Sequence, residues 1–262
     1  MDKFYIVANE TKDRDYRVTT RVKSFLENNG KEVYLFDPPE DVECVITIGG
    51  DGTLIRAAQA FAPKDVVFVG VNMGTLGFLT DVEPQTLEAS LRRLLDGDYE
   101  EEERMMLFST INKKGDFRAL NDVVISRSSF MQVIECSIYL NDKFLTSYRA
   151  DGVIVSTPTG STGYNISAGG PIAEPSSKII IITPICAHNL GARPIIMDRS
   201  VNIRIECHWR GDDGGAVVSY DGGDFIPLSR GDSIEINESE KKTRFLRFKE
   251  ESFVTTLSQK LL

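Results

Sequence analysis

The pattern of apolar and polar positions changes near residue 97, and before that point strand and helix patterns alternate. Apolar residues at helical spacing predict helices over residues 13–27 and 84–95, and a third beginning near residue 54. Four short apolar runs predict strands: FYIVAN from Phe4, EVYLF from Glu32, CVITI from Cys44 and VVFVGV from Val66. Strands that alternate with helices predict a parallel sheet connected by crossover helices.

After residue 98 the pattern is one of short β-type segments separated by turn signals such as Asn141-Asp142 and Asp221-Gly222-Gly223. This predicts an antiparallel, β-sandwich-like domain, and the charged run DYEEEER marks its edge. Residues 251–262 are helix-like again and are expected to return to the first domain. The predicted organisation is an α/β domain over residues 1–100, completed by a C-terminal segment 245–262, and a β-rich dinucleotide-binding domain over residues 101–244.

Composition narrows the possible partners. The 262 residues are 41% hydrophobic and 26% charged, and the formal net charge is −9. A charge of that sign argues against a nucleic-acid or anionic-membrane surface, so a phosphate ligand would be bound locally by backbone amides and a few cations. Four widely spaced cysteines predict reduced thiols, and two histidines provide little for a histidine metal site. With an N-terminus that is strand-like and no apolar run long enough to cross a bilayer, we expect a cytoplasmic protein.

The most informative motif is GGDGT, residues 49–53, placed between a predicted strand and a predicted helix. Glycines allow a ligand to approach the backbone, and the N–H groups of the first helical turn point at the same place, so Gly49, Gly50, Gly52 and Thr53 form a candidate phosphate cradle. The spacing matches neither the Walker A loop nor the G-x-G-x-x-G fingerprint. In the simpler alternative, Asp51 only caps the helix. A second glycine-rich turn, NMGTLGF over residues 72–78, follows the next strand and would face the same crevice.

A second candidate site is the polar loop TPTGSTGYNISAGGP, residues 157–171, which follows Arg149 and Asp151 across one strand. Hydroxyl groups, a carboxylate and the ring of Tyr164 suit a nucleoside. Ser161 and Thr162 are also candidates to cap a short helix that runs through Ser167. The alternative is an ordinary turn rich in serine and threonine. The Asn121-Asp122 pair is predicted as a turn or strand edge. His188 is expected to be structural.

These motifs, taken together and in order, resemble those of the NAD kinase family. GGDGT, NMGTLGFLTD, the Asn121-Asp122 pair, RADGVIVSTPTGSTGYNISAGGPI, PICAHNLGARPI and VSYDG cover nearly the whole chain, and STPTGSTGY is the most specific of them. GGDGT alone also resembles the motif of diacylglycerol and sphingosine kinases and of phosphofructokinases. The resemblance implies two domains with an active-site cleft between them and a homo-oligomer, either a homotetramer or a homodimer.

The implied reaction is the ATP-dependent phosphorylation of the 2′-hydroxyl of the adenosine ribose of NAD, which gives NADP. Asp51 would be the catalytic residue, orienting the hydroxyl and accepting its proton late in the transfer. A divalent cation such as Mg²⁺ would accompany ATP, held mainly by phosphates and water. The resemblance implies that the NAD site is formed by Asp51, Gly52, Arg56, Phe78, Asn121, Asp122, Arg149, Asp151, Thr162, Gly163, Tyr164, Asn165, Ser167 and Cys186.

Three positions depart from the family pattern. Asp122 stands where glutamate is usual, Gly163 where alanine is common, and Gly223 where glutamine is frequent. These changes affect the expected ribose and base contacts more than the reaction itself. The rival interpretations are a lipid or sugar kinase that shares GGDGT, and a sensor that binds NAD or NADP without turnover.

Overall fold

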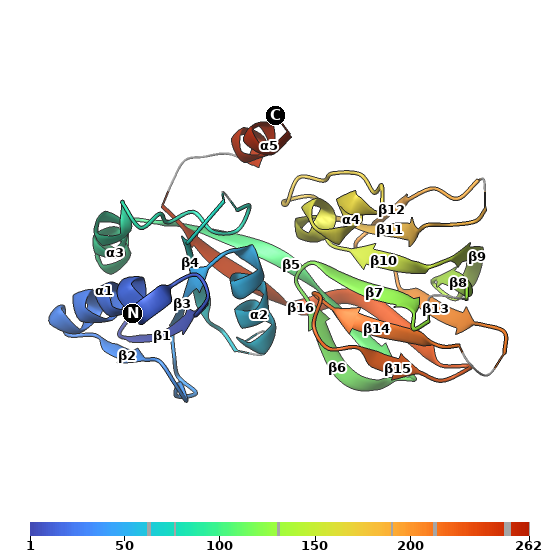
Figure 1. Ribbon diagram of the computed structural model, residues 1–262, viewed down its shortest axis with the longest axis horizontal. Helices are drawn as coiled ribbons and strands as arrows, with labels where there is room; N and C mark the ends of the chain where they lie inside the picture. The colour runs from blue at the N-terminus through green and yellow to red at the C-terminus, as the bar shows by residue number, and fades with distance from the viewer. Residues whose placement is uncertain are drawn as a thin grey trace. The chain divides into compact units, whose positions relative to one another are not determined.

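The computed structural model describes residues 1–61, 64–75, 77–129, 132–189, 191–211, 214–248 and 253–261 (Figure 1). The chain divides into two compact units. The first contains Met1–Arg104 and Thr243–Leu262, and the second contains Met105–Lys242. Two strands, β5 (Glu100–Ile111) and β16 (Ser233–Arg247), contribute to both units.

The first unit is built on a parallel sheet, as the alternating pattern predicts. Its strand order is β2-β1-β3-β4-β16, and every pairing along this path is parallel. The strands are β1 (Lys3–Ala8), β2 (Glu32–Tyr34), β3 (Cys44–Gly49) and β4 (Val67–Asn72), together with the end of β16. The helices are η1 (Arg14–Tyr16), α1 (Arg17–Asn28), α2 (Asp51–Phe61), α3 (Leu87–Asp96) and α5 (Phe253–Leu261).

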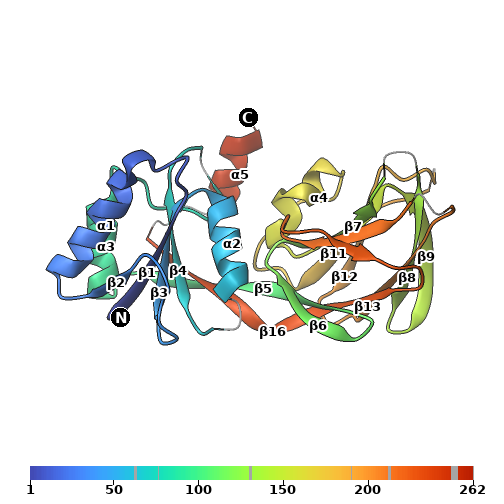
Figure 2. The ribbon, with the colours of Figure 1, turned by 60° about the horizontal axis from the view of Figure 1, so that its bottom comes forward.

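The helices cover both faces of this sheet. Figure 2 shows α1 and α3 on one face and α2 on the other. All six residues of β3 and all six of β4 are buried, which explains why both strands are continuous apolar runs in the sequence. The first helix begins at Arg17 and not at residue 13, because the Asp13 carboxylate accepts hydrogen bonds from the backbone amides of Val18 (3.0 Å) and Thr19 (2.9 Å). Residues 14–16 form the separate turn η1.

The second unit is β-rich, also as predicted, and contains two antiparallel sheets. One has the order β16-β13-β8-β9, with β5 paired to β16 and β6; the other has the order β12-β11-β10-β7-β14-β15. The remaining strands are β6 (Lys114–Ala119), β7 (Asp122–Arg127), β8 (Ile134–Leu140), β9 (Lys143–Ala150), β10 (Gly152–Ser156), β11 (Ile179–Ile185), β12 (Ile195–Asp198), β13 (Ile203–His208), β14 (Ala216–Tyr220) and β15 (Ile226–Leu228). Two short helical segments are η2 (Thr159–Thr162) and α4 (Tyr164–Ser167).

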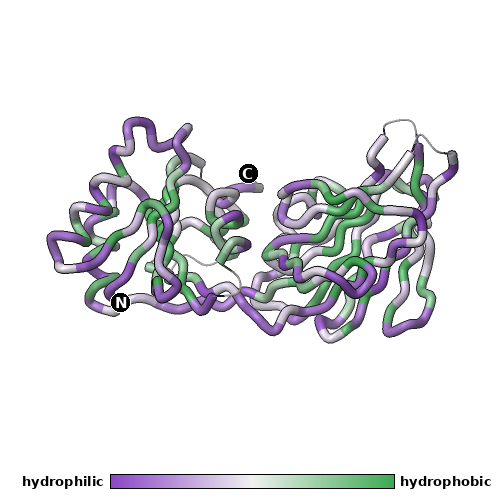
Figure 3. The backbone as a smooth tube through the Cα atoms, turned by 90° about the horizontal axis from the view of Figure 1, so that it is seen from below, coloured by the Kyte–Doolittle hydropathy of each residue, from purple (hydrophilic) through white to green (hydrophobic). Residues whose placement is uncertain are grey.

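One apolar core lies between these two sheets, because each contributes alternate inward side chains to it. Ile203 and Ile205 of β13 face this core, as do Val153 and Val155 of β10. The backbone tube coloured by hydropathy shows hydrophobic segments, in green, in the interior of this unit (Figure 3). A smaller cluster covers the other face of the β7, β10 and β11 sheet, where Ala168 packs beside Ile154. The polar loop that contains η2 and α4 is therefore packed against the sheet.

None of the helices within the described ranges is long and apolar enough to cross a membrane.

Candidate functional site

In the first unit, the two glycine-rich turns follow neighbouring parallel strands and touch each other. Strand β3 ends at Gly49 and α2 begins only two residues later, at Asp51. The turn after β4 is joined to the GGDGT turn by a hydrogen bond from the Met73 amide to the Gly49 carbonyl (2.6 Å). The structure thus brings together the two turns at the carboxyl edge of the sheet, where open α/β sheets bind their ligands.

The Asp51 carboxylate does not cap its own helix. Its Oδ2 accepts a hydrogen bond from the amide of Phe78 (2.7 Å). Its Oδ1 accepts from the amides of Leu79 and Thr80 (3.2 Å each) and from the Thr80 hydroxyl (3.1 Å). Four donors therefore hold one carboxylate, and all belong to residues 78–80. The capping alternative is wrong, because the side chain points into the neighbouring turn and not at the first turn of α2.

Gly77 leaves room for this arrangement. A Cβ built on Gly77 would lie 2.8 Å from the Asp51 Cγ and 2.5 Å from the Thr80 hydroxyl, and closer still to Asp51 Oδ1. Any side chain here would displace the carboxylate or the loop. The glycine therefore has a steric role in placing Asp51.

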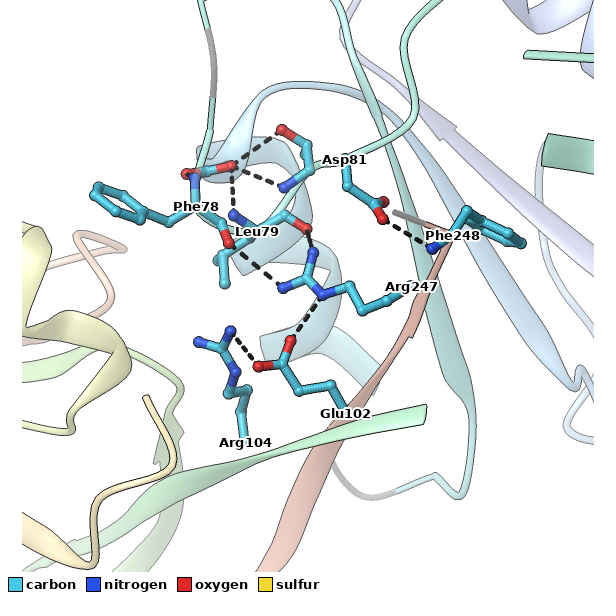
Figure 4. A network of polar contacts seen from close by, with 9 residues as sticks. Phe78, Leu79, Asp81, Glu102, Arg104, Arg247 and Phe248 are labelled. Atoms are coloured by element: carbon cyan, nitrogen blue, oxygen red, sulfur yellow. Dashed lines mark hydrogen bonds and ion pairs between the residues drawn. The ribbon is translucent and has the colours of Figure 1, made fainter. Parts of the chain in front are cut away.

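An arginine from the end of β16 supports the loop that binds Asp51 (Figure 4). The Arg247 guanidinium donates to the carbonyl of Leu79 (2.6 Å) and to that of Phe78 (3.4 Å). Its Nε binds Glu102 (2.7 Å), which also binds Arg104 (2.7 Å). These contacts form a chain of charges that runs from β5 and β16 to the Asp51 loop, and the sequence gives no sign of it.

The pKa values in this chain follow from burial and pairing. Burial alone would raise the pKa of Glu102, but the charges of Arg247 and Arg104 outweigh it, and the pKa is lowered. Arg104 is 4% exposed, and its burial lowers the pKa of its guanidinium. Glu102 therefore remains ionised between two arginines, as a carboxylate that links two cations.

Two other predicted residues of this unit lie near the turns. A Cβ on Gly52 would be 3.7 Å from a terminal nitrogen of Arg56, so this guanidinium lies beside the GGDGT turn. The ring of Phe78 packs against Phe253 of α5, with ring centroids 5.7 Å apart, and the Lys260 ammonium lies 4.4 Å from its centroid. Phe78 is thus covered by α5 in this conformation.

In the second unit, Leu120 and Asn121 form the break between β6 and β7, and Asp122 is the first residue of β7, in line with the predicted turn or strand edge. Asp221, at the turn after β14, closes this corner: its carboxylate accepts hydrogen bonds from the amides of Leu120 (2.8 Å), Asn121 (2.7 Å) and Asp122 (3.1 Å). The Asn121 Oδ1 is buried and has no hydrogen-bond partner among the described residues. An unsatisfied buried acceptor of this kind is expected where a ligand or water donates.

Asp122 and Asp221 form a buried acidic pair. Burial, and then the charge of Asp221, raises the pKa of Asp122 to about 7. Burial also raises the pKa of Asp221 to about 6, although its three amide donors oppose the shift. Sequence reasoning missed Asp221, because Asp-Gly-Gly has the composition of an ordinary hairpin turn. Only the fold connects it to residues 120–122.

The polar loop of residues 157–171 is packed tightly against this corner. A Cβ on Gly160 would lie 2.6 Å from the backbone carbonyl carbon of Asn121, so only glycine fits. The amide of Asn165 is used inside the protein: its Nδ2 donates to the carbonyls of Ser161 (3.1 Å) and Pro171 (2.9 Å), and its Oδ1 accepts from Thr183 (2.6 Å). The structure gives Asn165 a role in shaping the loop.

The predicted helix cap in this loop is wrong. Helix α4 begins at Tyr164, its N-cap is Gly163, and no side chain caps it. The Ser161 hydroxyl instead pairs with the backbone of Ala173. Thr162 donates its hydroxyl to the carbonyl of Thr159 (3.3 Å).

Tyr164, Asp151, Asp122 and Cys186 share one neighbourhood. Partial burial raises the pKa of Tyr164, and the charges of Cys186, Asp151 and Asp122 add to the shift. Asp151 is held by an ion pair with Arg127 (3.0 Å), another contact that sequence reasoning missed. The side chains of Arg149, Tyr164, Ser167 and Cys186 are exposed, and Cys186 has a positive φ of 48°. An aromatic ring, hydroxyls and a fixed carboxylate thus remain available to a ligand.

Comparisons with known proteins show the family of the chain. Residues 36–99 match the family model described as the ATP-NAD kinase N-terminal domain, and residues 120–248 match that of the ATP-NAD kinase C-terminal domain. The chain is 41% identical to an NAD kinase of Lachnoclostridium phytofermentans, over 99% of each chain. It is 40% identical to an NAD kinase of Lachnospira eligens, over 100% of each chain.

Two solved structures share the fold. An NAD kinase from Archaeoglobus fulgidus, in complex with ATP, superposes with a TM-score of 0.81 at 27% identity, covering 95% of this chain and 94% of that one. A yeast NADH kinase complexed with NADH gives a TM-score of 0.83 at 24% identity, covering 100% of this chain and 87% of that one. The α/β unit and the β-rich unit together define an NAD kinase-like fold. The chain belongs to the NAD kinase family.

Proposed function

We propose that this protein transfers the γ-phosphoryl group of ATP to the 2′-hydroxyl of the adenosine ribose of NAD, giving NADP and ADP. The observation that carries the proposal is the position of Asp51: a carboxylate held by three backbone amides and a hydroxyl, next to two glycine-rich turns at the carboxyl edge of a parallel sheet. A protein that only bound the dinucleotide would have no use for a carboxylate among phosphate-binding amides.

The geometry supports an orienting role for Asp51. Its Oδ1 accepts three hydrogen bonds and its Oδ2 only one, so Oδ2 keeps a lone pair for the ribose hydroxyl. The hydroxyl oxygen attacks the γ-phosphorus, the bond to the β-phosphate oxygen breaks, and ADP leaves. The hydroxyl proton passes to Asp51 late, once the new bond has begun to form. A loose transition state does not require a strong base, so a carboxylate that orients the hydroxyl is sufficient.

In this proposal the two units have different roles. The α/β domain of residues 1–100 and 245–262 supplies phosphoryl transfer, through Asp51, the amides of Gly49, Gly50, Gly52 and Thr53, and Arg56. The β-rich domain of residues 101–244 binds the dinucleotide, through Asn121, Asp122, Arg149, Asp151, Thr162, Tyr164, Ser167 and the backbone of Cys186. Gly163 and Asn165 shape the loop of residues 157–171, and the ring of Phe78 packs on the adenine side of the bound dinucleotide.

A divalent cation such as Mg²⁺ is part of the proposal. Within the described residues no group of three or more histidine, cysteine, aspartate or glutamate side chains could hold a metal ion. A cation that arrives with ATP and is coordinated mainly by phosphate oxygens and water fits this donor set. We also propose a cytoplasmic location and a homotetramer or homodimer, on the strength of the family resemblance.

The direct test is to incubate the full-length protein with NAD, ATP and Mg²⁺ and to measure NADP with an NADP-specific dehydrogenase. Asp51→Asn preserves the shape of the side chain and removes its charge, and it should abolish NADP formation while leaving NAD binding nearly unchanged. Calorimetric titration with NAD provides the second measurement. NADP formation by Asp51→Asn at the wild-type rate would refute the assigned role, and its absence in the wild type would refute the function.

A further inference from the structure

The turn that follows β1 is the third turn at the carboxyl edge of the parallel sheet, and no motif marks it in the sequence. Strand β1 pairs directly with β3, the strand that ends in GGDGT. The turn is anchored at both ends. The backbone N–H of Asn9 donates to the Ile48 carbonyl (2.8 Å). The Asp13 carboxylate accepts hydrogen bonds from the backbone amides at the start of α1. Three adjacent strands therefore deliver three turns to one edge.

Internal hydrogen bonds fix the shape of this turn. The Asn9 side-chain oxygen accepts from the amides of Thr11 (3.1 Å) and Lys12 (3.3 Å), and the Asn9 carbonyl accepts from the amides of Lys12 (3.0 Å) and Asp13 (2.9 Å). The Asn9 side-chain nitrogen also reaches the Thr53 hydroxyl in α2 (3.5 Å). The backbone at Lys12 is thus held in a defined position relative to the GGDGT helix.

Lys12 places its ammonium over both glycine-rich turns. A Cβ built on Gly50 would lie 2.8 Å from Lys12 Nζ, and one built on Gly74 would lie 3.5 Å from the same atom. Apart from this ammonium and neighbours in the chain, no described atom lies within 4 Å of either position. The glycine backbone is therefore open to a ligand and faces a cation. Among the described residues, no acidic group forms an ion pair with Lys12.

We propose that Lys12 binds the triphosphate of the phosphoryl donor, ATP. The transferred phosphoryl group must lie beside Asp51, and Gly50 precedes Asp51 directly, so an ammonium at Gly50 lies where the β- and γ-phosphates are required. Arg56 lies at Gly52, on the other side of Asp51, and the two cations flank the turn. In a protein with a net charge of −9, local cations of this kind are needed to hold a triphosphate. Lys12 provides the phosphate-binding lysine that GGDGT itself lacks.

This inference rests on the proposed function for the identity of the donor, but its test does not require turnover. The variants are Lys12→Gln, Lys12→Arg and the control Lys23→Gln. Lys23 is a lysine of α1 that pairs with Glu27 (3.7 Å), so its removal changes the net charge by the same amount away from the turns. The full-length proteins would be titrated calorimetrically with ATP and Mg²⁺ and, separately, with NAD. Inorganic tripolyphosphate would serve as a competitor of ATP.

Lys12→Gln should weaken ATP binding by about tenfold to a hundredfold, the usual effect of losing a hydrogen bond to a charged group. The same variant should weaken the binding of tripolyphosphate to a similar extent, and its dissociation constant for NAD should stay within about twofold of the wild-type value. Lys12→Arg should retain most of the ATP affinity, and Lys23→Gln all of it. In turnover, Lys12→Gln should raise the KM for ATP and leave the KM for NAD unchanged.

The proposal is overturned if Lys12→Gln binds ATP as wild type does, or if it loses NAD affinity and keeps ATP affinity. It is also overturned if Lys12→Arg and Lys12→Gln lose ATP affinity equally and both melt at lower temperature, which would indicate a structural role. If the wild type bound ATP but formed no NADP, the proposed function would fail. The difference in ATP affinity between wild type and Lys12→Gln would still decide the role of Lys12.

Discussion

Replacing Gly77 by alanine tests whether the loop of residues 77–80 determines the position of Asp51. The added Cβ would lie 2.8 Å from Asp51 Cγ and closer to its Oδ1, whereas ordinary contacts of a Cβ are at least about 3.4 Å. The carboxylate or the loop must therefore move by about 1 Å. A displacement of that size at a reacting group costs about a hundredfold in rate.

We therefore expect Gly77→Ala to lower kcat by about a hundredfold, with KM values for ATP and NAD within about threefold of wild type. Steady-state NADP formation with each substrate varied in turn gives these parameters. Gly191→Ala is the matched control, because a Cβ at Gly191 meets nothing within 4 Å. Circular dichroism melting curves of both variants would show whether the fold is retained.

A double-mutant cycle with Asp51→Asn identifies the route of the effect. If Gly77→Ala acts only by displacing the carboxylate, adding it to Asp51→Asn should cost little further activity, and the two effects should be strongly non-additive. The reasoning is refuted by a Gly77→Ala variant with wild-type kcat, or by additive losses, since either result would separate the loop from Asp51.

Two further predictions concern other buried charges. Arg247→Met should lower kcat about tenfold and reduce the melting temperature, because the carbonyls of Phe78 and Leu79 lose their hydrogen-bond donor. Arg247→Lys should not restore activity, because lysine lacks the planar guanidinium that donates to both carbonyls. Steady-state kinetics of both variants would test this prediction. For Asp122, the folded-state pKa of about 7 lies above the unfolded value of 3.8, so its contribution to stability is present below pH 4 and is lost as the pH rises towards 7. We therefore expect the free energy of unfolding of Asp122→Asn, relative to that of wild type, to be higher at pH 7 than at pH 5 by on the order of 2–4 kcal/mol. Urea unfolding of both proteins at the two pH values measures this difference. If the variant and the wild type differed equally at both pH values, the raised pKa of Asp122 would be contradicted.

The sequence was sufficient to predict features that depend on neighbouring residues. The buried strands β3 and β4 are continuous apolar runs, and the glycines that end β3 are visible beside them, so the parallel sheet and the glycine-rich turn at its edge could be predicted. The family assignment, the two-part fold and the kinase class are confirmed by the family models and by full-length relatives. The motifs made this possible because each is a short segment with its own chemistry.

The contacts that position the site could not be predicted, because they join residues far apart in the chain. Asp51 binds amides 27 to 29 residues away, and Arg247 reaches Leu79 across 168 residues. Asp221 lies about 100 residues from the corner that it closes. Lys12 has no sequence signal, since a lysine in a polar turn is typical of any surface. Its position depends on the anchoring of Asn9, which only the fold provides.

The two carboxylates most involved in the proposed site have opposite environments, and this separates their roles. Asp51 is surrounded by four hydrogen-bond donors, and its Oδ2, which accepts only one of these bonds, has a lone pair left for an alcohol. Asp122 is 5% exposed and lies beside a second acid, so it carries a proton over much of the range below pH 7. A protonated carboxyl donates a hydrogen bond where an ionised one only accepts. At Asp122 the protein would therefore offer a donor to the nucleotide at low pH and an acceptor at high pH. The pH dependence of NAD affinity should follow this residue, and only the part that comes from the neighbouring Asp221, whose pKa is raised to about 6, should remain in Asp122→Asn. A pH dependence of NAD affinity that persists unchanged in that variant would assign the titration to another group.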